Sequence, residues 1–236
     1  MRLVFVLDCK DLDGLAAFRT AAIGYRVSSS SEPYVVLVPE NGHGPELVLQ
    51  RVGEPKTTKN RMHLDIPTDE LGSAVQHLEA LGARRLQPGV TEEARFRWVV
   101  MADPEGNEFC VIEPGNSFLA DCGFIGALAS EGSQDVGYFW SEALGWPLVW
   151  DQDQETAIRS PHGGPKITWG GPPLTPKTGK YRLHFDLAPP ERGDQQAEVD
   201  RLVSLGATRI DIGQGEVSWV VMADPDGHEF CVLTPR

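Results

Sequence analysis

Hydrophobic and polar positions in the first fifty residues follow the pattern of a strand, a helix and further strands. Residues 4–7 form an uninterrupted apolar run, and apolar side chains then recur at helical spacing over residues 12–23. Gly24 follows the last of these positions, and a glycine there is typical of a helix end. A short strand after it and two β-rich runs at 34–38 and 46–49 complete a predicted β-α-β-β-β module.

A second module of the same kind is predicted for the residues that follow. Residues 61–66 alternate as a strand, and residues 71–81 carry apolar positions at helical spacing. This helix is predicted to be capped by Thr68 and ended by Gly82. The sequence Asp-Pro-Glu-Gly at 103–106 has the composition of a tight turn, so the apolar runs on either side of it are expected to form a hairpin.

The two-module pattern occurs twice in the chain. Trp98–Pro114 reads WVVMADPEGNEFCVIEP and Trp219–Pro235 reads WVVMADPDGHEFCVLTP, identical at 13 of 17 positions. The same spacing of 121 residues relates Arg61–Ile66 to Arg182–Leu187. A repeat of this length is a domain rather than the unit of a solenoid. We therefore predict an α+β fold with two β-α-β-β-β modules in each half.

With this arrangement the sequence resembles the vicinal-oxygen-chelate superfamily, in particular its glyoxalase-like, bleomycin-resistance-related branch; the superfamily also includes dioxygenases. The resemblance rests on the tandem modules, on the His-x-Asp strands and on the hairpins DPEGNEFC and DPDGHEFC. It implies one glyoxalase-like domain at 1–117 and a second at 121–236, each curving its sheet around a cavity. It also implies that the two halves pair within the chain about an approximate twofold axis, while further oligomerisation is left open.

In metal-dependent members of that family, four strands around a cavity each supply one metal ligand. The corresponding positions are Val4, Val48, His63 and Cys110 in the first half and Ile125, Thr168, His184 and Cys231 in the second. Each half thus keeps only a His and a Cys, whereas catalytic zinc usually has about three protein ligands. The expectation is therefore no resident metal and no cofactor.

His63 and Asp65 share one face of their predicted strand, because side chains two residues apart point the same way. The same holds for His184 and Asp186. One interpretation is a general base, or a group that hydrogen-bonds a ligand, whose tautomer the aspartate fixes. The other is a buried, hydrogen-bonded pair that only stabilises the sheet. The sequence leaves both open.

Cysteine and arginine residues accompany each of these histidines. Cys110 and Cys231 are expected on the same face, and we interpret them as packing residues because no neighbouring sequence feature would activate a thiol. Arg61 and Arg182 precede the histidines by two residues, so they can either meet an anionic ligand or pair with nearby acids. Pairing with acids is the simpler interpretation.

Tryptophan is distributed unevenly between the halves. Trp150, Trp169 and Trp219 lie in or beside predicted strands of the second half, whereas Trp98 is the only tryptophan of the first. Indole rings suit planar or cationic ligands. We therefore expect a ligand in the second half, with these three tryptophans around His184.

Composition and charge narrow the classes of partner. The chain has 34 acidic and 21 basic residues, a formal net charge of -13, so phosphate backbones and anionic lipid surfaces would be repelled. No nucleic-acid or membrane partner is expected. The apolar run at the start is stopped by Asp8 and the four cysteines form no C-x-x-C pair, which favours a cytoplasmic protein with reduced thiols.

Three hypotheses for function follow. The first is that the chain binds or sequesters a small molecule, such as a natural product or a drug, in a fold that lacks the full set of metal ligands. The alternative is a lyase, isomerase or dioxygenase of the same superfamily, either metal-free or with an atypical metal site. A third is that one half has become a structural partner of the other.

Overall fold

The computed structural model describes residues 1–42, 44–86 and 98–236, in which the strands form two mixed sheets. Sheet A runs in the order β14-β15-β16-β13-β1-β4-β3-β2, with bounds Thr208–Arg209, Val220–Ala223, Glu229–Val232, Leu183–Ala188, Arg2–Cys9, Leu47–Arg51, Tyr34–Pro39 and Tyr25–Ser31. Sheet B runs in the order β10-β11-β12-β9-β5-β8-β7-β6, with bounds Leu148–Gln152, Glu155–Arg159, Lys166–Trp169, Ala127–Ser130, Met62–Pro67, Glu108–Ile112, Trp98–Ala102 and Arg84–Arg85. The helices are α1 Leu12–Ile23, α2 Leu71–Ala80, α3 Gln134–Leu144 and α4 Gln195–Ser204, with a short 3-10 helix η1 at Ser117–Leu119.

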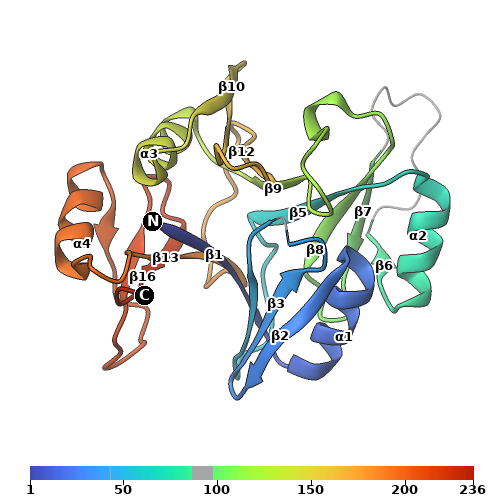
Figure 1. Cartoon of the computed structure of the whole chain (residues 1–236), viewed down its shortest axis with the longest axis horizontal. Helices are drawn as coiled ribbons and strands as arrows, with labels where there is room; N and C mark the ends of the chain where they lie inside the picture. Colours follow the sequence, from blue (N-terminus) through green and yellow to red (C-terminus); the bar gives the residue numbers. More distant parts are fainter. Residues whose placement is uncertain (43, 87–97) are drawn as a thin grey trace.

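Each module contributes four strands and one helix, which confirms the predicted α+β fold of tandem modules. The sheets, however, are not built from the two modules of one half. Sheet A joins the first module to the fourth through antiparallel pairing of β1 with β13, and sheet B joins the second to the third through β5 and β9 (Figure 1). The expectation that each half encloses its own cavity is therefore wrong. Within its own module, the first strand pairs along one edge only. Pairing across the halves covers the second edge in all four modules.

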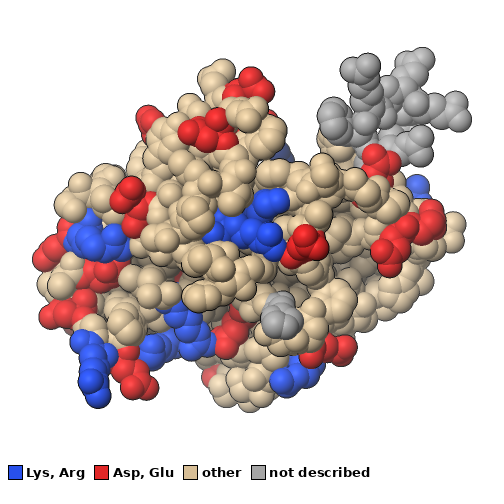
Figure 2. Space-filling view, turned by 45° about the horizontal axis from the view of Figure 1, so that its top comes forward, with Lys and Arg blue, Asp and Glu red and all other residues tan. Residues whose placement is uncertain are grey.

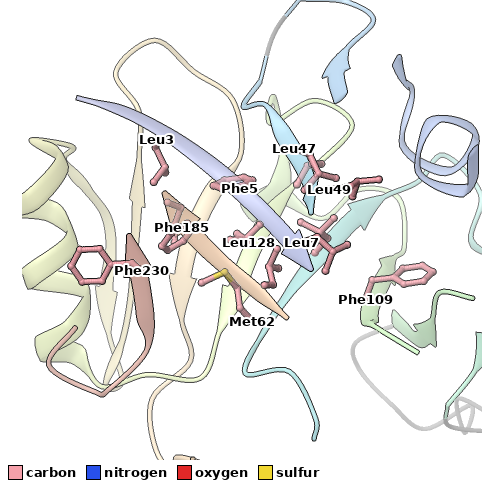
Figure 3. Close-up of a cluster of buried hydrophobic side chains, with 14 of the residues drawn as sticks. Leu3, Phe5, Leu7, Leu47, Leu49, Met62, Phe109, Leu128, Phe185 and Phe230 are labelled. Atoms are coloured by element: carbon pink, nitrogen blue, oxygen red, sulfur yellow. The ribbon is translucent and has the colours of Figure 1, made fainter. Parts of the chain in front are cut away.

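The main core lies on the helix side of both sheets. Along β1, Leu3, Phe5 and Leu7 face this core, and Phe5 packs on Phe185 of β13 with ring centroids 5.6 Å apart (Figure 3). The alternate positions of these strands point to the other face of each sheet, which we call the helix-free face. The histidine and aspartate of both His-x-Asp strands lie on that face: His63, Asp65, His184 and Asp186.

The turns between the last two strands of each half tie the modules together. The Glu105 carboxylate accepts hydrogen bonds from the backbone N–H groups of Lys10, at 2.8 Å, and Asp11, at 2.5 Å, just before α1. In the second half the Asp226 carboxylate accepts in the same way from Ser133 N–H, at 2.5 Å, at the start of α3. A carboxylate is favourable at the beginning of a helix because backbone donors and the helix dipole meet there. These contacts therefore fix one sheet against the other.

The beginning of α2 differs from the prediction. Glu70, not Thr68, caps this helix, with its carboxylate accepting from the N–H groups of Gly72 and Ser73. Thr68 still belongs to the sheet, because its backbone N–H and its hydroxyl both donate to the Ile112 carbonyl. The glycine predicted to end the first helix is confirmed, since Gly24 adopts a left-handed φ of 63°.

Charge and hydrophobicity of the exterior follow ordinary patterns. On the face seen in Figure 2, lysine and arginine side chains lie among acidic ones, and no single-sign region covers it. Among the described residues, no helix has the length and the apolar character that a membrane span requires. All four cysteines are buried and unpaired.

Candidate functional site

Two clusters of histidine, aspartate and cysteine lie on the helix-free faces, one in each sheet. In sheet B, His63 and Asp65 of β5 meet Cys110 of β8, because parallel pairing sets Asp65 beside Cys110. The His63 Nε2 lies 3.5 Å from Asp65 Oδ1, and one ligand atom from each of the three residues lies within 4.8 Å of the others. The sequence therefore correctly placed these three side chains on one face.

Sheet A contains the corresponding cluster of His184, Asp186 and Cys231. Here His184 Nε2 lies 3.6 Å from Asp186 Oδ1, and the donor atoms again converge within 4.8 Å. In both clusters the aspartate Oδ1 is buried, and no hydrogen bond joins it to the part of the chain that the structure describes. The aspartate thus adds a third donor to the two that the sequence counted.

The thiols of both clusters are held in their protonated form. Burial raises the pKa of Cys110 to about 12, and the negative charge of Asp65 acts in the same direction. Burial and Asp186 likewise raise the pKa of Cys231. Burial also raises the pKa of Asp186, although His184 opposes that shift. Lys59 and Lys180 oppose these shifts but do not cancel them, so neither cysteine is an activated nucleophile at neutral pH.

The residues beside each histidine on the helix-free face differ between the two sheets. We call the row of residues across the neighbouring strands the floor of that sheet. Across the neighbouring strands of sheet B, His63 is followed by Ala129, Thr168 and Ala157 on the same face. The corresponding row in sheet A runs from His184 to Val6, Val48 and Val36. The row in sheet B thus consists of alanine and threonine, which are smaller side chains than the three valines of sheet A. In agreement, the His63 side chain is 28% exposed and that of His184 only 10%.

The tryptophans of the second half are divided between the sheets. Trp150 shares the face of Thr168 in sheet B and is 38% exposed, while Trp219 directly precedes β15 of sheet A. They therefore do not surround one histidine, as the sequence had suggested. Trp98, from the first half, reaches the same face of sheet B and is 46% exposed.

Trp169 is not brought to either cluster. It is 2% exposed and belongs to the core on the helix side, so close to Gly132 that a Cβ there would lie 2.4 Å from its ring. Its neighbour Thr168 takes the helix-free face, and strand alternation then sends Trp169 to the other. The prediction that Trp169 contacts a ligand is therefore wrong, because Thr168 and not Trp169 lies on the helix-free face.

The connection between the halves covers part of sheet B. Leu119 packs in a small core with Cys110, Ile112 and Ala127, and Phe118 lies against it. The Lys166 ammonium lies 4.1 Å from the centroid of the Phe118 ring and also binds its carbonyl oxygen. Trp150 meets the same ring edge-on at 6.1 Å. In the sequence, the adjacent apolar pair Phe118–Leu119 is the signal of this packing.

Lysine–carboxylate pairs flank both clusters at corresponding positions. In sheet A the Lys180 ammonium lies 2.6 Å from Asp8, and in sheet B Lys59 lies 2.8 Å from Glu131. Burial lowers the pKa of Lys180, but attraction to Asp8 outweighs it, and the net pKa is raised. Sequence reasoning had taken Asp8 only as the residue that interrupts an apolar run.

Within the described part of the chain, Arg61 and Arg182 donate to backbone carbonyl oxygens and form no ion pair with local acids. Arg61 donates to the carbonyl oxygens of Thr175, at 2.5 Å, and Asp226, at 2.9 Å, and its guanidinium lies 5.5 Å from the Tyr181 ring. Arg182 donates to the carbonyl of Glu54. Both side chains are buried and connect segments of the two halves, so their role is structural.

The residues of either cluster fit a metal ion. Imidazole nitrogen, thiolate and carboxylate are the ligands that zinc takes, and three of them with an open position are typical of catalytic zinc. The buried, unpartnered oxygens of Asp65 and Asp186 add to the fit, because such an atom lacks the compensation that burial demands. The expectation of no metal site counted only the histidine and the cysteine of each cluster and left out the aspartate.

Comparison with known proteins gives a consistent result. Residues 4–112 and 127–233 each match the family described as "Glyoxalase-like domain". A protein named glyoxalase 1 from Caenorhabditis briggsae is 28% identical over 146 residues, which cover 57% of this chain and 49% of that protein. The chain thus spans about half the length of this curated relative.

Solved structures share the fold over almost the whole chain. Glyoxalase I from Zea mays aligns with a TM-score of 0.64 at 14% identity, covering 99% of this chain and 92% of that one. A putative dioxygenase from Bacillus subtilis subsp. subtilis str. 168 aligns with a TM-score of 0.61 at 12% identity, covering 98% and 83%. At such identities the likeness concerns the fold alone.

Proposed function

Because the chain belongs to the glyoxalase-like domain family, with one family match in each half, we propose that it binds a small organic molecule on the helix-free face of sheet B. His63, Asp65 and Cys110 form the polar end of this site, and Trp150 and Trp98 form its aromatic rim. This places the ligand on a sheet shared by both halves rather than in the second half.

The floor of small residues carries the proposal. Ala129, Thr168 and Ala157 lie in a row between His63 and Trp150, and such a floor with a few convergent polar groups is typical of ligand sites. In sheet A the corresponding valines occupy that space. There His184 and Asp186 act as the structural pair that the sequence left open.

Each residue of the site has a distinct role. The imidazole of His63 hydrogen-bonds the ligand, and Asp65 orients the ring from 3.5 Å. The protonated thiol of Cys110 packs beside them. The exposed rings of Trp150 and Trp98 supply apolar contact at low cost in conformational entropy.

The experiment exchanges one floor residue between the sheets. Ala129→Val gives sheet B the side chain that Val6 supplies in sheet A, in a strand where valine is favourable. A panel of natural products and drugs is screened by thermal shift, and hits are measured by calorimetry. We expect Ala129→Val and His63→Ala to abolish binding, and His184→Ala to leave it intact. Equal binding by Ala129→Val and wild type would refute the proposed site.

A second candidate is an enzyme of the same superfamily with an atypical metal site. The third donor, Asp65, favours it, because His63, Asp65 and Cys110 would hold a zinc-like ion with an open position. A bound ion would supply a Lewis acid and an activated water. Metal content after loading with zinc or cobalt distinguishes the two candidates. About one equivalent of metal that is lost in Cys110→Ser and His63→Ala supports the enzyme. No retained metal favours the binding protein.

A further inference from the structure

A large cavity lies away from both His-Asp-Cys clusters. Its volume is about 520 Å³, within the range of sites for small molecules. It opens between the loop joining β3 to β4 and the loop joining β11 to β12, which are corresponding loops of the first and third modules. Leu3 and Phe5 of β1 face it from the helix side of sheet A. We call it the interloop cavity.

Glycines bring the two loops together and expose their main chain. A Cβ on Gly164 would lie 3.8 Å from the Cα of Gly44, and both residues have a positive φ, at 91° and 136°. The Arg159 guanidinium donates to the Gly164 carbonyl at 2.9 Å and also to the carbonyl of Asp121. These contacts fix one wall of the cavity.

The described residues that line the cavity include aromatic side chains and one carboxylate. Phe5, Trp146 and Leu3 provide apolar surface, and Ser160 and His162 provide polar groups. Asp121 is the only carboxylate among the described residues that line the cavity, and its carboxylate makes no ion pair with any described residue. Arg159 does not line the cavity, and two of its guanidinium nitrogens donate to carbonyl oxygens.

We propose that the interloop cavity is a second binding site, for a small planar aromatic cation. The ligand ring lies against Trp146, and its protonated nitrogen meets the Asp121 carboxylate. An indole face attracts cations, and a carboxylate beside it adds a directional partner. The proposal does not depend on the site in sheet B, because the two sites share no residue.

The test uses 9-aminoacridine, a planar cation at neutral pH, and the neutral compound acridone as comparison. Calorimetry and tryptophan fluorescence should show saturable binding, with one molecule of the cation bound in the interloop cavity of each chain. We expect Asp121→Asn to weaken it about fivefold to tenfold, because one partly exposed ionic contact is lost. Asn keeps the left-handed backbone of Asp121, whose φ is 61°.

Asp153 offers a matched control. It also has a left-handed φ, at 54°, is exposed and lies in the turn between β10 and β11, outside the cavity lining. Asp153→Asn removes the same charge and should leave the affinity unchanged. Equal weakening by both variants would mean non-specific attraction to the acidic chain and would overturn the proposal.

A second measurement locates the bound probe. The backbone amides of Gly42, Gly44, Gly163 and Gly164 should shift in NMR spectra on addition of 9-aminoacridine. His63→Ala should not change the affinity, which separates this site from the one in sheet B. Shifts confined to sheet B residues, or affinity for acridone equal to that for the cation, would refute the assignment.

Discussion

Asp103 and Asp224 occupy corresponding turns of the two halves but have different partners. Asp103 forms a fully buried ion pair with Arg19 at 2.6 Å. Asp224 instead accepts a hydrogen bond from the uncharged indole N–H of Trp140 at 3.1 Å. The first turn therefore contains a compensated charge, and the second contains a carboxylate for which burial raises the pKa to about 6.

Replacing Arg19 by methionine should strongly destabilise the chain. The substitution leaves the carboxylate of Asp103 buried without its cation, which typically costs about 3–5 kcal/mol. Urea unfolding measures the loss. Arg26→Met, at an exposed position of β2, is the control and should change the free energy of unfolding by less than about 0.5 kcal/mol. Similar values for both variants would show that the ion pair contributes little.

Asp224 should make stability fall as pH rises through about 6. Its folded pKa lies above the unfolded value of about 3.9, so the folded state favours the protonated acid. This contribution is fully present below the unfolded pKa and is lost between about pH 4 and pH 7, and it amounts to roughly 2–3 kcal/mol. Burial lowers the pKa of His228 to about 4, which acts in the opposite direction.

Comparison with Asp224→Asn isolates the contribution of the Asp224 carboxyl group to the pH dependence of stability. The free energy of unfolding of the variant relative to wild type should rise by roughly 2–3 kcal/mol from pH 4 to pH 7, because only the wild type loses the proton. Asparagine keeps one of the two acceptor oxygens, so either Trp140 or the N–H groups of Asp226 and His228 lose their acceptor, which shifts the whole curve but not its slope. A constant difference across this range would contradict the raised pKa.

Among the elements, strand alternation and the connection between the halves shape the proposed site in sheet B. Alternation sends Thr168 and Trp169 to opposite faces of β12, so Thr168 reaches the helix-free face and Trp169 the core. The segment containing η1 then crosses the helix-free face and places Phe118 against Lys166 and Trp150. Sheet B thus leaves His63 more exposed than sheet A leaves His184, and it is covered beside Cys110.

Removing the Phe118 ring should make Cys110 more accessible. In Phe118→Ala, a thiol reagent applied under native conditions should label Cys110 several times faster, as read by mass spectrometry of its peptide. Cys231, at the corresponding position in sheet A, serves as the reference in the same molecule. Phe124→Ala removes an exposed ring from the same connection and should have no effect. Unchanged labelling of Cys110 would show that Phe118 does not cover it.

At the scale of the whole molecule, neither half is complete by itself. Each sheet needs one module from the first half and one from the second, because β1 pairs with β13 and β5 with β9. An isolated half would expose both of these strand edges, and exposed edges of this length promote association.

The separated halves, 1–117 and 121–236, should therefore associate when mixed. Sedimentation should show a one-to-one complex, and each half alone should self-associate or unfold. The matched control is the intact chain cut by an engineered protease site between residues 115 and 121, which should sediment as the uncut protein does. Two stable, non-interacting monomers would contradict the shared sheets.

The sequence by itself determined the local structure and the faces. The period of apolar residues placed the strands and helices, the repeat of 121 residues showed two equivalent halves, and alternation put His63, Asp65 and Cys110 on one face. These features follow from backbone geometry over a few residues, so they can be read along the chain.

Only the tertiary structure decided which module meets which. The edge of β1 could pair with β5 of its own half or with β13 of the other, and both strands present the same His-x-Asp pattern. That choice gave His63 a floor of Ala129 and Thr168, and gave His184 a floor of valines. It depends on the surface buried by all modules together, a sum over contacts between residues distant in sequence, which no local pattern contains.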